Sequence, residues 1–129
     1  MNLGLQGKTA QIPAEMIHYG VTKTAQVAVA RGLAETLAGT GVTVNSVLVG
    51  PTASEGAGTF VEELAHRQGV AKAEVERQFF AAVRPSSLLK RFETPEEVGA
   101  VVAFVVSEQA RVINGAAVRA EGGVLRSIL

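Results

Sequence analysis

Two residues four positions apart, Tyr19 and Lys23, are the clearest candidates for chemistry in this sequence. On a helix, side chains with this spacing share one face, with their Cβ atoms about 6 Å apart. An ammonium group at that distance stabilises a phenolate, so the pair could exchange a proton with a substrate. The spacing also fits a chance pair on an exposed helix, and the elements that position the pair must decide between the two interpretations.

Composition narrows the chemistry that the 129 residues can perform. All twelve acidic residues are glutamates and there is no cysteine, which excludes aspartate-based triads, thiolate nucleophiles and cysteine-ligated metals. We therefore expect no metal site. A net charge of zero without a basic stripe argues against nucleic-acid binding. With 47% hydrophobic residues and no apolar run of membrane-spanning length, we expect a soluble, cytoplasmic protein without a membrane partner.

The Tyr19–Lys23 pair lies near the start of a long predicted helix. Pro13 suits a first helical turn, good helix formers continue to Leu37, and Gly39-Thr40-Gly41 ends the pattern. The apolar residues cover more than half of the circumference of this helix, which is broader than a helix with one wet face requires. We expect it to meet a sheet on one side and another protein surface on the other.

A predicted strand, 42–49, follows this helix. It is rich in β-branched residues and bounded by glycines, which predicts burial on both faces. Residues 50–59 are rich in Gly, Pro and Thr and predict a loop, and helices are expected at 60–67 and 72–83. A helix, a glycine turn and a buried strand in this order indicate a parallel α/β sheet.

The last third of the chain predicts one more helix and one more strand. Residues 94–97 form a capping-box pattern with proline in the first turn, and the helix should continue to Ser107. A turn at 114–115 precedes a short strand at 116–120, which the glycines 122–123 end. Two strands cannot form a stable parallel sheet alone, so either self-association or a missing first half should cover them.

Taken in order, these landmarks resemble the short-chain dehydrogenase/reductase family. The resemblance runs from Gln11 to the C-terminus and rests on Tyr19-Gly20-Val21-Thr22-Lys23, Val44–Thr52, Arg91–Val98, Asn114-Gly115 and Glu121-Gly122-Gly123. It implies the C-terminal portion of a doubly wound, Rossmann-type parallel sheet. We expect a single partial domain over 1–129, with an atypical start at 1–10, the tyrosine helix within 11–39, the strand at 42–49, a loop and helical lobe at 50–92, and a helix, strand and tail over 94–129.

The resemblance also implies a site. In the family, the residue matched by Tyr19 exchanges a proton with the substrate hydroxyl or carbonyl, and the one matched by Lys23 stabilises the phenolate and holds the nicotinamide ribose. It implies that Lys23, Val49, Gly50, Thr52 and Ser54 contact NAD or NADP while an alcohol or ketone is the substrate. From the residues alone, Gly50-Pro51 can equally be a simple turn.

Three departures from the family pattern leave two hypotheses open. The glycine-rich dinucleotide fingerprint is absent, Gln6 stands where the family has its catalytic serine, and the family's helix asparagine would precede residue 1. Residues 1–10 also match poorly, so we expect a chain that begins inside a family gene. One hypothesis is an oxidoreductase that is incompetent alone. The other is a non-catalytic module that forms a homo-oligomer through the helix at 13–38.

Overall fold

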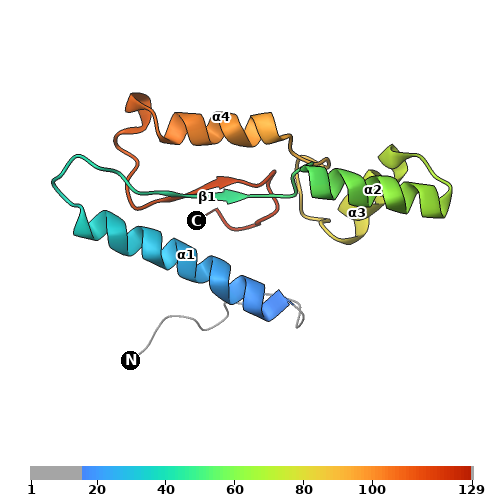
Figure 1. The fold of residues 1–129 in the computed structure, drawn as a ribbon, viewed down its shortest axis with the longest axis horizontal. Helices are drawn as coiled ribbons and strands as arrows, with labels where there is room; N and C mark the ends of the chain where they lie inside the picture. The colour runs from blue at the N-terminus through green and yellow to red at the C-terminus, as the bar shows by residue number, and fades with distance from the viewer. Residues whose placement is uncertain (1–15, 129) are drawn as a thin grey trace.

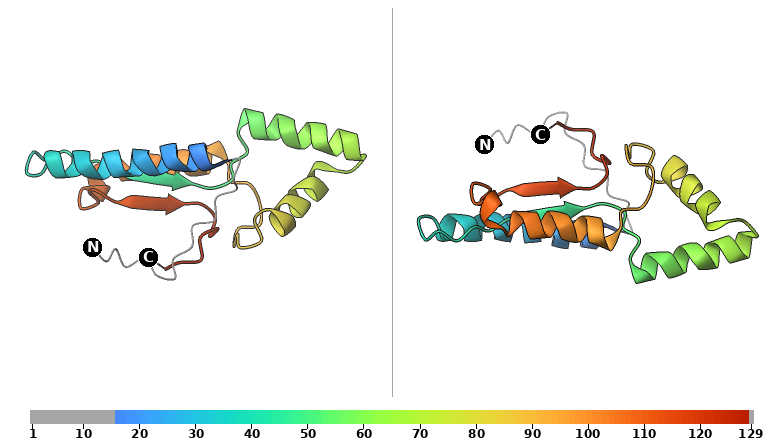
Figure 2. Two further views of the ribbon diagram at one scale, coloured as in Figure 1. Left: turned by 90° about the horizontal axis from the view of Figure 1, so that it is seen from below. Right: turned by 90° about the horizontal axis from the view of Figure 1, so that it is seen from above.

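The computed structural model describes residues 16–128, which form an α/β arrangement around a small parallel sheet. Strands β1 and β2 pair in register, with Ser46 beside Ala117 and Val49 beside Ala120. Figures 1 and 2 show α1 and α4 on opposite faces of this sheet, while α2 and α3 form a lobe beyond the carboxyl end of β1. The elements are α1 (Ile17–Thr36), β1 (Ser46–Val49), α2 (Glu55–Gln68), α3 (Lys72–Ala82), α4 (Pro95–Val105), η2 (Glu108–Ala110) and β2 (Ala117–Ala120).

The long tyrosine-bearing helix is confirmed over Ile17–Thr36, and its predicted start at Pro13 lies outside the described residues. Its buried residue is Ala34, which packs against the turn at Gly115. A Cβ atom on Gly115 would lie 3.4 Å from the Cβ of Ala34, and the φ angle of +67° there favours glycine. The apolar side chains nearer the middle of α1 are largely exposed, Val29 by 60%.

The predicted strand 42–49 is shorter than expected, since β1 covers only Ser46–Val49. The residues just before β1 form hydrogen bonds to the segment that precedes β2 instead of pairing with a strand. The N–H of Val44 donates to Oδ1 of Asn114 at 3.0 Å, and the side chain of Asn45 donates to the carbonyl of Ile113 at 2.8 Å. The expected burial on both faces is also wrong for these residues, because a sheet of two strands leaves Val49 47% exposed.

The prediction of a loop over 50–59 is wrong in its second half, because α2 begins at Glu55. Ser54 adopts the extended conformation of an N-cap, and Glu55 places a negative charge at the positive end of the helix. These features outweigh the low helix propensity of Gly56 and Gly58. The helix then ends at Gly69, whose φ angle of +65° gives a left-handed cap.

The capping box of α4 is confirmed. The hydroxyl of Thr94 accepts from the N–H of Glu97 at 3.2 Å, and the carboxylate of Glu97 accepts from the N–H of Thr94 at 2.9 Å. None of the helices described between residues 16 and 128 combines the length and apolarity that a membrane span requires. The fully buried apolar residues of this part of the chain are few and scattered: Ala34, Ala65, Val75, Phe80, Val105 and Ala110.

Candidate active site

A cavity of about 870 Å³ lies at the carboxyl ends of both strands. Its walls come from α1, from the segments that follow β1 and β2, and from the inner faces of α2 and α3. In parallel α/β sheets, ligands bind in the crevice outside the carboxyl ends of the strands. The position of the cavity therefore makes it the candidate active site, and the side chains that line it define its chemistry.

Tyr19 reaches this cavity from the first turn of α1, and its side chain is half exposed. The ammonium nitrogen of Lys23 lies 5.5 Å from the centroid of the Tyr19 ring. At this distance the cation is attracted to the face of the ring and lies beside the phenol. Lys23 itself is exposed and does not line the cavity. The structure thus brings the predicted pair together at the mouth of the site.

The end of β1 and the loop after it line the cavity, and they include Val49, Gly50 and Thr52, three of the residues predicted to contact the cofactor. A Cβ atom on Gly50 would lie 2.7 Å from the Cα atom of Glu121, so only glycine allows the two strand ends to approach this closely. The hydroxyl of Thr52 donates to the carbonyl of Gly50 at 3.0 Å. Gly50-Pro51 is thus part of the cavity wall as well as a turn.

Ser54, the remaining predicted cofactor residue, does not line the cavity. It caps α2 through its backbone, since its carbonyl accepts from the N–H of Gly58 at 2.8 Å, and its hydroxyl makes no capping hydrogen bond. Gln6, which stands at the family's serine position, lies outside the described residues. Of the predicted site residues, the cavity is therefore lined by Tyr19, Val49, Gly50 and Thr52. Lys23 lies beside the Tyr19 ring, and Ser54 follows Thr52 by two residues but lies outside the lining.

Sequence reasoning missed Glu93, because it took most glutamates as surface charges. Only 6% of this residue is exposed, and neither carboxylate oxygen has a hydrogen-bond partner within the described residues. Its backbone joins the loop after β1, donating to the carbonyl of Pro51 at 2.9 Å and accepting from the N–H of Ala53 at 2.8 Å. Burial raises the pKa of the Glu93 carboxyl above its usual 4.5, and the charge of Glu121 adds to this rise.

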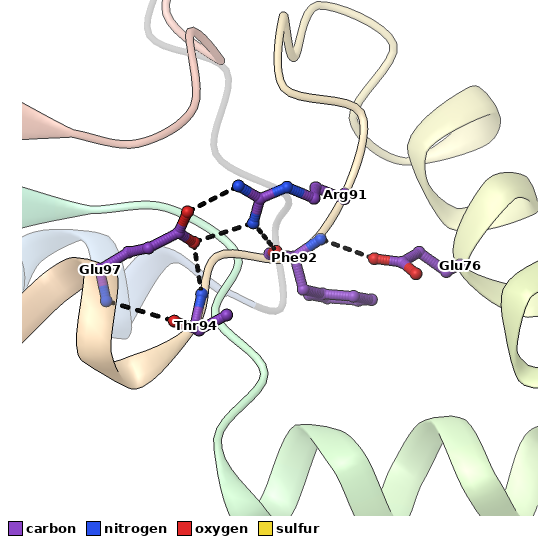
Figure 3. A network of polar contacts seen from close by, with 5 residues as sticks. All are labelled: Glu76, Arg91, Phe92, Thr94 and Glu97. Carbon is purple, nitrogen blue, oxygen red and sulfur yellow. Dashed lines mark hydrogen bonds and ion pairs between the residues drawn. The ribbon is translucent and has the colours of Figure 1, made fainter.

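A polar network joins the segment around Glu93 to helix α3 on one side and to helix α4 on the other, as Figure 3 shows. The N–H of Phe92 donates to the carboxylate of Glu76 on α3 at 2.7 Å. Arg91 donates two hydrogen bonds to the carboxylate of Glu97 on α4, at 2.6 and 2.8 Å. The Arg91 guanidinium, together with the N–H of Thr94, lowers the pKa of Glu97 to about 2. The network thus ties the helical lobe to the start of α4 on either side of Glu93.

The phenylalanines of the lobe are a second group that sequence reasoning missed. The rings of Phe79 and Phe92 stack with their centroids 5.1 Å apart, and both line the cavity. Phe80 packs edge-on against each of them and is almost fully buried. Phe60 lines the cavity from α2. Four of the five phenylalanines fall between residues 60 and 92, and this clustering was the available signal.

The sequence of this chain matches those of known proteins over most of its length. A family model described as enoyl-(acyl carrier protein) reductase matches residues 1–125. The oxidoreductase YvrD of Bacillus subtilis is 41% identical over 128 residues, which are 99% of this chain and 48% of that protein. The oxidoreductase YvaG of the same organism is 43% identical over 114 residues, or 88% of this chain and 43% of that protein. The chain belongs to the short-chain dehydrogenase/reductase family.

Solved structures of short-chain dehydrogenases/reductases share the fold. L-sorbose reductase from Gluconobacter frateurii, solved with NADPH and L-sorbose, superposes with a TM-score of 0.75 at 25% identity over 85% of this chain and 41% of its own. YwfH, an NADPH-dependent reductase involved in bacilysin biosynthesis, gives a TM-score of 0.72 at 27% identity over 92% and 43%. The chain spans about half the length of the curated relatives it matches. The predicted fold, part of a doubly wound parallel sheet, is confirmed.

We predict that Gly50→Ala destabilises the chain by about 1–3 kcal/mol, because the new Cβ collides with the backbone of Glu121. Gly99→Ala is the matched control, since a Cβ on this exposed glycine of α4 meets nothing within 4 Å. There, the higher helix propensity of alanine should stabilise by up to about 1 kcal/mol. Urea unfolding followed by circular dichroism measures both changes, and equal stability of the two variants would contradict the close approach.

We predict that Glu93→Gln weakens the pH dependence of stability above pH 4.5. A raised pKa in the folded state means that the carboxyl's contribution is present below 4.5 and is lost as the pH rises through the folded value. Glutamine does not titrate, so the variant should lose less stability than the parent between pH 4.5 and 8.

Glu97→Gln is the control for this experiment. The lowered pKa of Glu97 gives a contribution that is present above pH 4.5 and is lost as the pH falls towards 2. Glu97→Gln should therefore change how the free energy of unfolding depends on pH below 4.5. Unfolding free energies measured across this range test both variants, and a Glu93→Gln profile parallel to that of the parent above pH 4.5 would refute the assignment.

Proposed function

We propose that this chain supplies the proton-transferring pair and the substrate cavity of an NAD(P)-dependent oxidoreductase acting on an alcohol or ketone. The observation that carries the proposal is the placement of Tyr19 in one cavity with Gly50 and Thr52, at the carboxyl ends of parallel strands, with the Lys23 ammonium beside its ring. The NADPH dependence stated for YwfH and the NADPH bound to L-sorbose reductase support the choice of cofactor.

In the direction of reduction, a ketone takes up a hydride and a proton to give a secondary alcohol. The hydride would come from a nicotinamide cofactor held at the loop Val49–Thr52. The hydroxyl of Tyr19 donates the proton to the carbonyl oxygen, and the cation of Lys23 stabilises the resulting phenolate. In the direction of oxidation, the phenolate takes the proton back, so the same pair serves both directions.

The described residues fit one end of the cofactor better than the other. The loop Val49–Thr52 offers a glycine surface and a hydroxyl beside Tyr19, which suits a nicotinamide ring and its carboxamide. For the diphosphate, the family uses a glycine-rich turn between a strand and a helix. In this part of the chain, Gly56 and Gly58 lie inside the first turn of α2, and Gly39 and Gly41 lie between a helix and a strand. We therefore propose that the 129 residues by themselves do not bind the dinucleotide productively.

We predict that the 129-residue chain alone shows neither saturable micromolar NADPH binding nor turnover of a carbonyl panel. Mixing it with the N-terminal half of YvrD, the 41% identical relative, should supply a dinucleotide site and restore NADPH-dependent reduction. In the mixture, Tyr19→Phe should reduce turnover about 100-fold or more and leave NADPH binding unchanged, because only the proton donor is lost. Nucleotide fluorescence and absorbance measure the two quantities.

His18→Phe is the control for Tyr19→Phe, because this neighbouring exposed residue points about 100° away around the helix. It should leave turnover within twofold of the parent mixture. Saturable binding and turnover by the 129-residue chain alone would contradict its proposed incompetence. Full turnover by the Tyr19→Phe mixture would contradict the role of the tyrosine.

A second candidate function, self-association through α1, rests on the exposure of that helix. Val21, Val29 and Leu33 are exposed by 61%, 60% and 48%, and residues 24–30 carry no charge. Ala25 and Leu33 also line a shallow apolar groove of about 440 Å³ along the helix. Small residues in this stretch permit close approach of a second helix, and a two-fold dimer is the simplest arrangement.

We predict that the chain sediments as a dimer at micromolar concentration and that Ala28→Glu shifts it towards the monomer, because the variant places a charge in the middle of the uncharged stretch. Ala73→Glu, on an exposed position of α3, is the matched control and should leave the distribution unchanged. Sedimentation velocity distinguishes the states. A compact monomer in the parent chain would count against this second function.

A further inference from the structure

The candidate active site has walls that are almost entirely apolar away from the loop after β1. Helix α2 contributes Phe60, Val61 and Leu64, and α3 contributes Val75 and Phe79. The remaining apolar lining comes from Val83, Phe92 and the tail residues Val124 and Leu125. A molecule that fills this cavity therefore exchanges water for aliphatic and aromatic carbon over most of its surface.

Apart from Tyr19, the polar side chains in the lining are few, and each forms at least one hydrogen bond within the protein. Gln78 donates to the carboxylate of Glu74 at 2.8 Å. Arg84 donates to the carbonyl of Val83 at 3.0 Å. Glu121 accepts from the N–H groups of Val124 and Leu125 in the turn after β2.

The two hydroxyls of the lining differ in this respect. Thr52 donates to the carbonyl of Gly50, whereas the hydroxyl of Tyr19 has no hydrogen-bond partner among the described residues. The Tyr19 hydroxyl is thus free to meet a substrate oxygen. Most of the lining is apolar, so a substrate with several hydroxyls would place many of them against carbon, and each polar group buried without a partner costs about 1–3 kcal/mol.

The aromatic wall is held in place on two sides. Phe79 and Phe92 stack on each other, and the buried ring of Phe80 supports both from behind. The backbone of Phe92 is fixed by its hydrogen bond to Glu76. Phe60 on α2 lines the same cavity and is 61% exposed. An apolar group bound in the cavity would cover part of this exposed ring.

We propose that the substrate is an apolar ketone or secondary alcohol carrying an aryl or branched alkyl group, and not a sugar or polyol. The reacting oxygen meets Tyr19, and the apolar group packs against the aromatic side chains of the lining, Phe60, Phe79 and Phe92. This assignment rests on the proposed function for the identity of the reacting group, and on the lining of the cavity for everything else. It separates this chain from L-sorbose reductase, which shares its fold and was solved with a sugar.

The test measures binding in the absence of nucleotide, using 4-phenylbutan-2-one and L-sorbose as probes. Tyr19 is the only tyrosine and the chain has no tryptophan, so its fluorescence reports occupation of the cavity directly. Backbone amide spectra recorded in the same titration locate the binding and show that the chain is folded. We expect the aryl ketone to bind at least tenfold more tightly than the sugar.

A pair of variants separates the cavity from general hydrophobicity. Phe60→Ser removes the exposed ring at the cavity and should weaken ketone binding about fivefold or more. Phe104→Ser removes a ring on α4 that is 51% exposed and lies outside the cavity, and it should leave binding within twofold. Both residues are more than half exposed, so neither change empties the core.

Each other outcome overturns the assignment. Equal or tighter binding of the sugar, equal effects of the two variants, absence of ketone binding, and a chain without a folded cavity all contradict it. The outcome is separable from that of the proposed function, because no cofactor is present. Ketone binding without turnover in the reconstituted mixture would contradict the function alone, and sugar turnover without ketone binding would contradict the substrate assignment alone.

Discussion

The close approach of the two strand ends is the constraint on which the rest of the structure depends. At Gly50 the backbone passes so near to Glu121 that no side chain fits between them. Next to this contact, the segment that leads from β1 to α2 and the segment that follows β2 both line one cavity. The carboxyl of Glu93 is buried against the two turns, lying close to where a Cβ of Gly50 or Gly122 would be. Backbone geometry, more than any side-chain bond, therefore creates the site.

Around this contact the described residues form several polar interactions, but few of their apolar side chains are buried. The ion pair of Arg91 with Glu97 is bidentate but exposed, and exposed pairs of this kind contribute little to stability. Its main effect is geometric, because it sets the path of the segment that carries Phe92 and Glu93 between the lobe and α4. Large apolar side chains on α1 and α4, such as Val29 and Phe104, remain exposed around the two-stranded sheet.

Several elements could be predicted because the information for them is local. The capping box at Thr94 and the helical spacing of Tyr19 and Lys23 each depend on a few neighbouring residues. The start of α2 was missed because Gly56 and Gly58 resemble loop residues until Ser54 and Glu55 are read as its cap and first turn. The length of β1 was missed because Val44 bonds to the amide side chain of Asn114 and Asn45 to the carbonyl of Ile113, partners about 70 positions away.

The sequence by itself determined which segments form helices and strands and the order in which they follow. It also indicated the tyrosine–lysine pair and the glycine loop after the first strand. These follow from spacing and from backbone preference, which act over one or two turns of chain. Only the tertiary structure decided that Glu93 is buried without a partner, that three phenylalanines form a fixed wall, and that Ser54 stands outside the cavity. Burial and cavity shape arise from segments distant in sequence, and no local pattern encodes which of them will meet.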